Sequence, residues 1–490
     1  MKVLSLDVSL ASFESPFQIM DEENDANNWI TVFIGENGTK KSLLLRLLVE
    51  AGLFSKVYKG HGHPGIRCSL NLNGEAAPKK VIAISGTPFD RFPRGGTRDW
   101  HKKSMNAYEK KGYVYLGQRA ANGVVGTTQN EKTLSSVFIR YADRLLEQSI
   151  PLTRVFNHLK LQPALGIRVK RPNYLNVKTA KAGAPVMSRL RYEAYVRGLP
   201  EKLNELGASR VVTIRWLKQM EFFIEQLQNE DVSAGVMHLL EELHESQIAF
   251  WLTPDAHKIS RKNAVWKSLS DWRCAIDLGL VEVEGLNLAK MDEAALPMLA
   301  KDAVRDSDLS SGQWNWLSSL AGLTLELQDY SLVLIDEPEN SLHPSWQREY
   351  IQVLSEVMNS RNHCHAVIAT HSPFIASGLS ETMGNVRSLK MVHLDKDDQW
   401  KVHNSVVAPS YGWAANDVYQ DVFGMNSTRA PEFVERADLA LRILSEGRLE
   451  NAAQLREIVE MLKIDFLKLP AYDIMREILM DIISDAASFG

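Results

Sequence analysis

A short glycine- and lysine-containing stretch near the start of the sequence has the residue types needed to hold phosphate groups. It reads GENGTKKS, from Gly35 to Ser42, and lies between an apolar β-branched run and a stretch of helix formers. Glycines allow backbone N–H groups to turn inward around phosphate oxygens at a helix N-terminus. A lysine then reaches the β- and γ-phosphates, and a hydroxyl holds Mg²⁺. We therefore predict that this strand, loop and helix bind a nucleoside triphosphate.

The residues of this loop have separate predicted roles. Gly35 and Gly38 are the turn glycines, Lys41 is the phosphate lysine and Ser42 is the magnesium ligand. We also assign Asn37 and Lys40 to the nucleotide-binding residues.

Lys40 departs from the usual pattern, because a phosphate-binding loop normally has a glycine directly before its lysine. A side chain at this position must point outward, and its charge would lie beside the phosphates. We expect tight binding and slow turnover as a result. Two functions therefore remain open at this point: a slow ATPase, and a nucleotide-gated binding module that hardly hydrolyses at all.

A second stretch supplies paired carboxylates at the end of an apolar strand. It reads SLVLIDEPENSLHP, from Ser331 to Pro344. Phosphoryl transfer needs one charge to orient the metal and another to position the nucleophile. We predict that Asp336 faces a water-linked Mg²⁺ and that Glu337 orients the attacking water.

A third stretch, LSSGQ from Leu309 to Gln313, comes just before an apolar helical segment. Small residues at a helix start leave N–H groups and hydroxyls free for an anion. The same residues are equally suited to an N-cap, with Ser310 or Ser311 accepting from the first-turn N–H groups. Both interpretations remain open from this stretch alone.

These three stretches, in this order, resemble the ABC-type ATPase superfamily, in particular its soluble branch with RecF, SMC and Rad50-like heads. LSSGQ is similar to the signature loop of that family. The resemblance implies that Ser310, Ser311, Gly312 and Gln313 contact the γ-phosphate bound by a partner subunit. It therefore also implies a head-to-tail homodimer, or a higher homo-oligomer, with two composite sites for ATP and Mg²⁺.

Two further residues fit the same family. Gln118, in YLGQR, resembles the Q-loop residue that lies near Mg²⁺ and the lytic water. His371, in IATHSPF, resembles the switch histidine that contacts the γ-phosphate. The resemblance thus implies Glu337 and His371 as the catalytic pair.

The expected fold is α/β, an ABC-ATPase-type head in which a mixed sheet has flanking helices. We predict lobe I at 1–130, a mainly helical insertion at 131–305, lobe II at 306–409 and a helical region at 410–490 that could dock a partner. A hairpin with LDKDDQW at its turn is expected in lobe II. Leu309 lies 267 residues after Ser42, unlike the closer spacing of transporters, and there is neither a C-x-x-C hook nor a sustained heptad arm.

Charge and hydropathy limit the possible partners and locations. The net charge of −4 argues against a nucleic-acid coat over the whole surface. Residues 151–218, however, hold fourteen Lys/Arg against three Glu, which suits a DNA or RNA backbone, an acidic partner chain or a solvated helix face. There is no continuous apolar run of membrane-spanning length and no signal-peptide pattern, so we expect a soluble, cytoplasmic protein without membrane contact.

Phrases outside these motifs resemble a narrower family, the Septu-type (PtuA-like) bacterial anti-phage ATPases. They are SGTPFDRFP (Ser85–Pro93), YVYLGQR and the segment from Ser410 to Phe433. This resemblance implies an ATPase that works beside a separate HNH nuclease subunit (PtuB-like) and controls nucleic-acid cleavage after infection. The acidic helices at 431–490 would dock that partner or cap the second lobe. A RecF-like DNA-repair ATPase and an ATPase with a TOPRIM nuclease partner (PARIS-like) are the alternatives.

Overall fold

A computed structural model shows two compact units, Met1–Gly412 and Trp413–Gly490, and each is described by itself. The structure describes residues 1–20, 26–54, 57–58, 66–74, 76–93, 111–117, 134–135, 137–145, 147–170, 250–254, 282–293, 296–297, 302–305, 308–394, 399–408, 411–425, 427–446 and 452–488.

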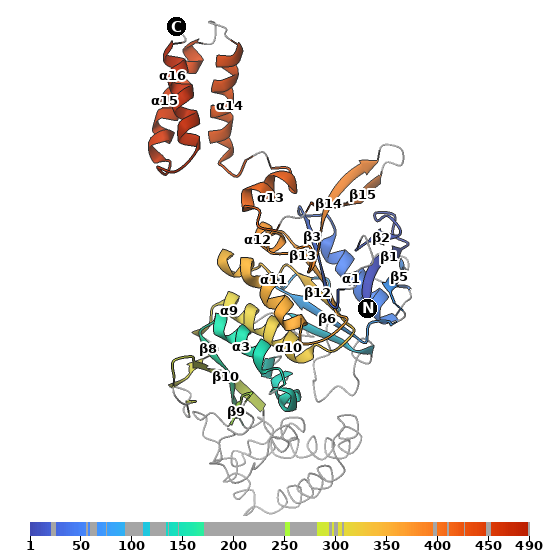
Figure 1. Cartoon of the computed structure of the whole chain (residues 1–490). Coiled ribbons are helices and arrows are strands. Elements are labelled where there is room, and N and C mark those ends of the chain that lie inside the picture. The colour runs from blue at the N-terminus through green and yellow to red at the C-terminus, as the bar shows by residue number, and fades with distance from the viewer. Residues whose placement is uncertain are drawn as a thin grey trace, which may run out of the picture. The chain divides into compact units, whose positions relative to one another are not determined.

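A seven-stranded sheet forms the centre of the first unit (Figure 1). In spatial order its strands are β15 (Gln399–Val406), β14 (Gly384–Leu394), β3 (Trp29–Gly35), β13 (His365–Thr370), β12 (Ser331–Asp336), β6 (Lys80–Ser85) and β7 (Tyr113–Gly117). All neighbours from β14 to β7 pair in parallel, and only β15 pairs antiparallel. Strands β3, β13, β12 and β6 are buried along their whole length, so they consist of nearly continuous apolar runs. Since parallel strands end at one edge, the loops after these four strands lie together there.

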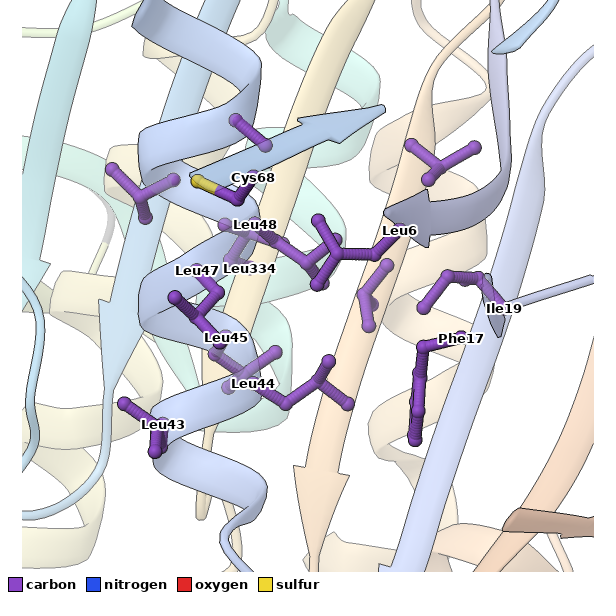
Figure 2. Close-up of a cluster of buried hydrophobic side chains, with 14 of the residues drawn as sticks. Leu6, Phe17, Ile19, Leu43, Leu44, Leu45, Leu47, Leu48, Cys68 and Leu334 are labelled. Atoms are coloured by element: carbon purple, nitrogen blue, oxygen red, sulfur yellow. The ribbon is translucent and has the colours of Figure 1, made fainter. Parts of the chain in front are cut away.

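Helix α1 (Lys41–Phe54) follows β3 directly and covers one face of this sheet. A smaller sheet packs on the other side of α1, with strands β2 (Phe17–Gln18), β1 (Lys2–Val8), β5 (Ile66–Asn73) and β4 (Val57–Tyr58). Figure 2 shows the core between these layers, to which α1 contributes a run of leucines including Leu44 and Leu48. This burial fixes the start of α1, and with it the phosphate-binding loop, against the ends of the strands.

The helix that begins with the LSSGQ stretch is buried on nearly all sides. It runs from Ser311 to Glu326 as α9 (Ser311–Trp316), a π-helical turn η6 (Leu317–Ala321) and α10 (Gly322–Glu326), and is called the signature helix below. Trp316, fully buried, donates from Nε1 to the Val155 carbonyl oxygen (3.2 Å) and stacks on His158. Other helical elements of the first unit are α3 (Ser149–His158), the 3₁₀ turn η2 (Ala142–Arg144), α11 (Pro344–Met358) and α12 (Pro373–Ala376).

The predicted insertion at 131–305 contains strands that the sequence did not suggest. Besides α3, its described part forms an antiparallel sheet in the order β11 (Val304–Arg305), β10 (Glu282–Lys290), β8 (Leu161–Lys170) and β9 (Phe250–Leu252). Most of the basic stretch 151–218 lies outside the described residues.

The predicted hairpin of lobe II is present. Strands β14 and β15 pair in antiparallel register from Arg387–Val406 to Leu394–Gln399, while residues 395–398, which include most of LDKDD, lie outside the described part. None of the described helices is both long enough and apolar enough to span a membrane.

The second unit consists of α13 (Ala415–Asp421) and a bundle of α14 (Pro431–Glu446), α15 (Ala452–Lys468) and α16 (Met475–Ser488). This confirms the predicted helical C-terminal region. The bundle has a core of its own, to which α15 contributes Leu455, Ile458, Val459 and Leu462. Two ion pairs hold the bundle together: Arg436 of α14 pairs with Asp465 of α15, and Arg429, before α14, pairs with Asp473, just before α16 (both 2.7 Å).

Because this bundle buries its own apolar core, we expect residues 413–490 to fold when expressed alone. Leu462→Ala should then lower the free energy of unfolding by about 2–5 kcal/mol, since Leu462 is fully buried. Leu467→Ala is the matched control on the same helix and should change it by less than ~0.5 kcal/mol, since Leu467 is 78% exposed. Urea unfolding followed by circular dichroism measures both. Equal losses of unfolding free energy in the two variants would show that the bundle core is not formed as described.

Candidate nucleotide site

The loop from Gly35 to Ser42 has the backbone of a phosphate cradle. A Cβ at Gly35 would stand 2.3 Å from the Leu389 carbonyl oxygen, so only glycine fits at the end of β3. Gly38 has a φ of +86°, and Lys40 has a φ of +63°. Lys40 therefore adopts the left-handed backbone that a glycine would normally provide, at a cost of about 1–2 kcal/mol. The loop keeps its shape although the glycine is missing.

The predicted phosphate lysine is folded onto this loop. Lys41 is 6% exposed, and its Nζ donates to the carbonyl oxygens of Gly35 (2.7 Å) and Glu36 (3.0 Å). Burial lowers the pKa of Lys41 to about 8, although nearby carboxylates, with Glu339 and Glu337 first among them, oppose that shift. The ammonium thus stays mostly charged at neutral pH, within reach of the phosphate-binding backbone.

The predicted magnesium ligands meet across the edge of the sheet. Ser42 Oγ lies 3.2 Å from Asp336 Oδ1, joining the start of α1 to the end of β12. Asp336 is 1% exposed, and its Oδ2 has no hydrogen-bond partner in the part of the chain that the structure describes. Burial raises the pKa of Asp336 to about 7, and the charges of Glu337 and Asp90 add to this shift. A buried carboxyl group with an unpaired oxygen fits a divalent cation, which supplies the missing positive charge.

The set of donors also suits Mg²⁺ in particular. The described residues contain no cluster of three or more His, Cys, Asp or Glu that could hold a metal by themselves. Mg²⁺ often takes only one or two carboxylates together with substrate phosphates and waters. One hydroxyl and one carboxylate beside a phosphate-binding loop match that requirement.

The predicted catalytic residues lie next to each other. His371 Nε2 is 3.8 Å from Glu337 Oε1, and both side chains are about one-third exposed. Glu337 has a φ of +48°, and its N–H donates to the Ala369 carbonyl oxygen (2.9 Å), so the turn after β12 is held against β13. Burial, and then the charge of Lys41, lower the pKa of His371 to about 4, so its imidazole is neutral at pH 7.

Glu339 also belongs to the site, although the sequence motifs did not predict it. Its carboxylate accepts from the backbone N–H of His371 (2.6 Å) and from Thr370 Oγ1 (2.8 Å). Burial raises the pKa of Glu339, and these hydrogen bonds offset part of that shift. Glu339 therefore ties the loop that carries His371 to the loop that carries Glu337. Its place in the motif SLVLIDEPENSLHP was the only available signal, because the contact with β13 depends on the fold.

The LSSGQ stretch forms an N-cap, as one of the two sequence interpretations expected. Ser310 Oγ accepts from Gln313 N–H (3.2 Å), and Gln313 Oε1 accepts from Ser310 N–H (2.8 Å), which makes a capping box. A Cβ at Gly312 would stand 2.2 Å from the Ser341 carbonyl oxygen, so the helix start is packed against the loop after β12. Ser311 remains exposed. The cap does not exclude an anion at Ser311, whose contact with a partner's nucleotide stays a prediction.

Two predicted residues are less defined. Gln118 lies outside the described residues, although the strand expected before it is present as β7 and ends at Gly117. Asn37 is exposed on the phosphate-binding loop. The roles of both residues stay predictions.

Known proteins are similar to parts of this chain. The family described as "AAA domain, putative AbiEii toxin, Type IV TA system" matches residues 280–377, which include the signature helix, Asp336, Glu337 and His371. The Septu protein PtuA of Bacillus thuringiensis is 28% identical over 23% of this chain and 27% of its own length. Protein ea59 of Escherichia phage lambda is 40% identical over 14% of the chain and 13% of its own length. The OLD nuclease of Thermus scotoductus is 36% identical over 14% and 12%, respectively.

Among solved structures, the Smc head domain of Pyrococcus furiosus, with an extended coiled coil and bound to the C-terminal domain of ScpA, superposes with a TM-score of 0.30 at 10% identity. It covers 83% of this chain and 96% of its own. A TM-score of that size is too low for any inference about this protein. The chain spans only about a quarter of the length of PtuA, and less of the other two relatives. Together, the sheet, the motifs and the sequence relatives support an ABC-type ATPase head that resembles PtuA.

The raised pKa of Asp336 gives a test that needs no nucleotide. With a folded-state pKa near 7 and an ordinary value of 3.8, this group costs the metal-free protein stability as pH rises from about 4 to 7. Asp336→Asn removes that cost, so we expect the variant to gain roughly 1–3 kcal/mol over the wild type between pH 5 and pH 8. Thermal unfolding in EDTA at a series of pH values measures this difference. A difference that does not change with pH would contradict the buried, unpaired carboxyl group.

Proposed function

We propose that this chain is the Mg²⁺-dependent ATPase subunit of a Septu-like bacterial anti-phage system, and that it regulates a separate HNH nuclease. The observation that carries the proposal is the meeting of Ser42, Asp336, Glu337 and His371 beside a phosphate-binding loop at one edge of the sheet. The resemblance to PtuA supports the defence setting and the nuclease partner.

The residues divide the work of hydrolysis among them. Ser42 and Asp336 would hold Mg²⁺, which supplies positive charge to the β- and γ-phosphates when bound. Lys41 is positioned to move from the carbonyls of its own loop to those phosphates. Glu337 is the carboxylate that orients the attacking water, since it follows the buried Asp336 and is itself partly exposed. Neutral His371 lies beside it, where its N–H can donate to the terminal phosphate.

We further propose that two copies pair head to tail around ATP. Ser311 is exposed in the first turn of a helix whose remaining length is buried, so it is available to another molecule. The N–H groups and hydroxyl at such a helix start favour an anion. In this arrangement Ser311 and Gly312 of one copy complete the nucleotide site of the other.

The basic stretch at 151–218 and the C-terminal bundle are the proposed contacts with other macromolecules. The first has fourteen basic against three acidic residues and would hold nucleic acid through its phosphates. The second has twelve acidic against seven basic residues at 431–490 and would dock the nuclease. Both assignments rest on charge, and the first one predicts contact with phosphates rather than with a particular base sequence.

A pull-down from the native host, with mass-spectrometric identification of stoichiometric partners, tests the proposed system. We expect an HNH nuclease. A TOPRIM-type chain would instead place the protein in a PARIS-like system. The absence of any partner, together with DNA-stimulated hydrolysis, would favour a RecF-like repair ATPase.

Replacement of the proposed catalytic carboxylate should separate binding from hydrolysis. Glu337→Gln removes the charge that orients water but keeps the metal ligands, so phosphate release should fall by roughly 100-fold or more. The variant should retain bound ATP, as measured by bound-nucleotide analysis. It should also remain dimeric in the presence of ATP, as measured by mass photometry. Glu381→Gln, an exposed control, should behave as wild type. Hydrolysis by Glu337→Gln at the wild-type rate would show that another group orients the water.

The effect of Lys40 on turnover can be tested by restoring the usual glycine. Lys40→Gly removes both a charge beside the phosphates and a strained left-handed backbone. We expect weaker ATP binding, a higher kcat and a small rise in melting temperature. Steady-state phosphate release measures kcat. An unchanged kcat would mean that Lys40 does not limit turnover.

A further inference from the structure

The loop that follows β6 is fixed directly on the end of strand β12. Gly86 N–H donates to the Asp336 carbonyl oxygen (3.0 Å). A Cβ added at Gly86 would stand 2.1 Å from the Glu337 carbonyl oxygen, so no larger residue fits without moving the backbone. This loop, Ser85–Pro93, has the sequence SGTPFDRFP.

Side chains that point inward hold the rest of this loop rigidly. Asp90 accepts from Tyr115 OH (2.7 Å) and from the Phe92 N–H (2.9 Å), and both Asp90 and Phe92 are buried. The alternate residues point outward: Phe89 is 89% exposed, and Arg91 is exposed as well. Arg91 thus projects from a loop whose position is set by its neighbours.

Arg91 lies beside the phosphate-binding loop. Its carbonyl oxygen is 3.5 Å from an N–H group of Arg46, one helical turn after Ser42. Lys40 directly precedes this helix, and the pKa of Lys40 is lowered by burial first and then by the charge of Arg91. Lys40 and Arg91 come from segments some fifty residues apart, and only the fold brings them together.

Within the described part of the chain, neither Lys40 nor Arg91 has an ion pair or a side-chain hydrogen bond. Their cationic neighbours differ in this respect, because Arg46 pairs with Glu50 (2.5 Å) and Lys41 donates to two carbonyl groups. Two cationic side chains near the start of α1, with no ion pair among the described residues, raise the local positive potential and attract an anion. At the mouth of a nucleotide site, the anion of matching chemistry is a phosphate group.

We propose that Lys40 and Arg91 together bind the terminal phosphate of the nucleoside triphosphate, and that the Ser85–Pro93 loop thereby distinguishes ATP from ADP. This inference rests on the proposed nucleotide-binding function. Strand β6 lies beside β12 on the side away from β3, so Arg91 reaches the site from the side of Asp336 and Glu337. That is where the terminal phosphate must lie if those carboxylates are to act on it. Planar guanidinium groups are well suited to such contacts.

Isothermal titration of Arg91→Ala with Mg²⁺ and either ADP or the non-hydrolysable β,γ-imido analogue of ATP tests the proposal. We expect affinity for the triphosphate analogue to fall about tenfold, the usual size of one lost charge-assisted contact. ADP affinity should fall less than about twofold, because ADP lacks the contacted phosphate. Arg91→Lys keeps the charge and should recover most of the loss for the triphosphate.

Arg67→Ala is the matched control. Arg67 is an exposed arginine on β5, and it lies opposite Val57 of β4 in the strand pairing, beyond the C-terminal end of α1. It should leave both affinities unchanged. Equal losses for ADP and the triphosphate in Arg91→Ala, or no loss at all, would overturn the inference while leaving the proposed function intact. Failure of the wild-type chain to bind either nucleotide would instead contradict the proposed function itself.

Discussion

The contact between Ser42 and Asp336 is the constraint on which the rest of the site depends. It joins the first turn of α1 to the end of β12 across the intervening strand β13, with one carboxylate oxygen bonded to Ser42 and the other unpaired in the described structure. Burying such a group is unfavourable without a positive partner. The core under α1, rich in leucine, and the fully buried strands keep it in place. The fold therefore maintains a buried carboxyl group in a position that suits a divalent cation.

Other parts of the site are arranged around this carboxyl group by hydrogen bonds between loops. Glu339 holds the backbone at His371, and Gly86 holds the loop after β6 against Asp336. Each bond links loops that follow different strands of one parallel sheet. These loops therefore lie together at the edge where the nucleotide is proposed to bind, and the start of the signature helix is packed against one of them at Ser341.

The sequence predicted the parts of the site that lie within short motifs. The phosphate-binding loop, the Asp336–Glu337 pair and His371 each follow an apolar strand, and parallel strands bring such ends together. It did not predict Glu339, Asp90 or Arg91, because their partners are distant in sequence and their roles appear only when the sheet order is known. It also did not suggest the sheet of β8 and β10, whose strands contain Pro163, Gly166 and Gly285 and so lack a clear alternating pattern. Lys40 shows the opposite case: a motif is broken in sequence, yet the backbone keeps the glycine geometry.

The most direct test of the account is equilibrium binding of ATP to the wild-type chain, measured by titration with and without Mg²⁺. We predict saturable binding of one nucleotide per chain that becomes markedly tighter when Mg²⁺ is present, because the cation would join the phosphates to Ser42 and Asp336. Binding that does not respond to Mg²⁺, or no binding at all, would contradict the assignment of this edge as a magnesium–nucleotide site.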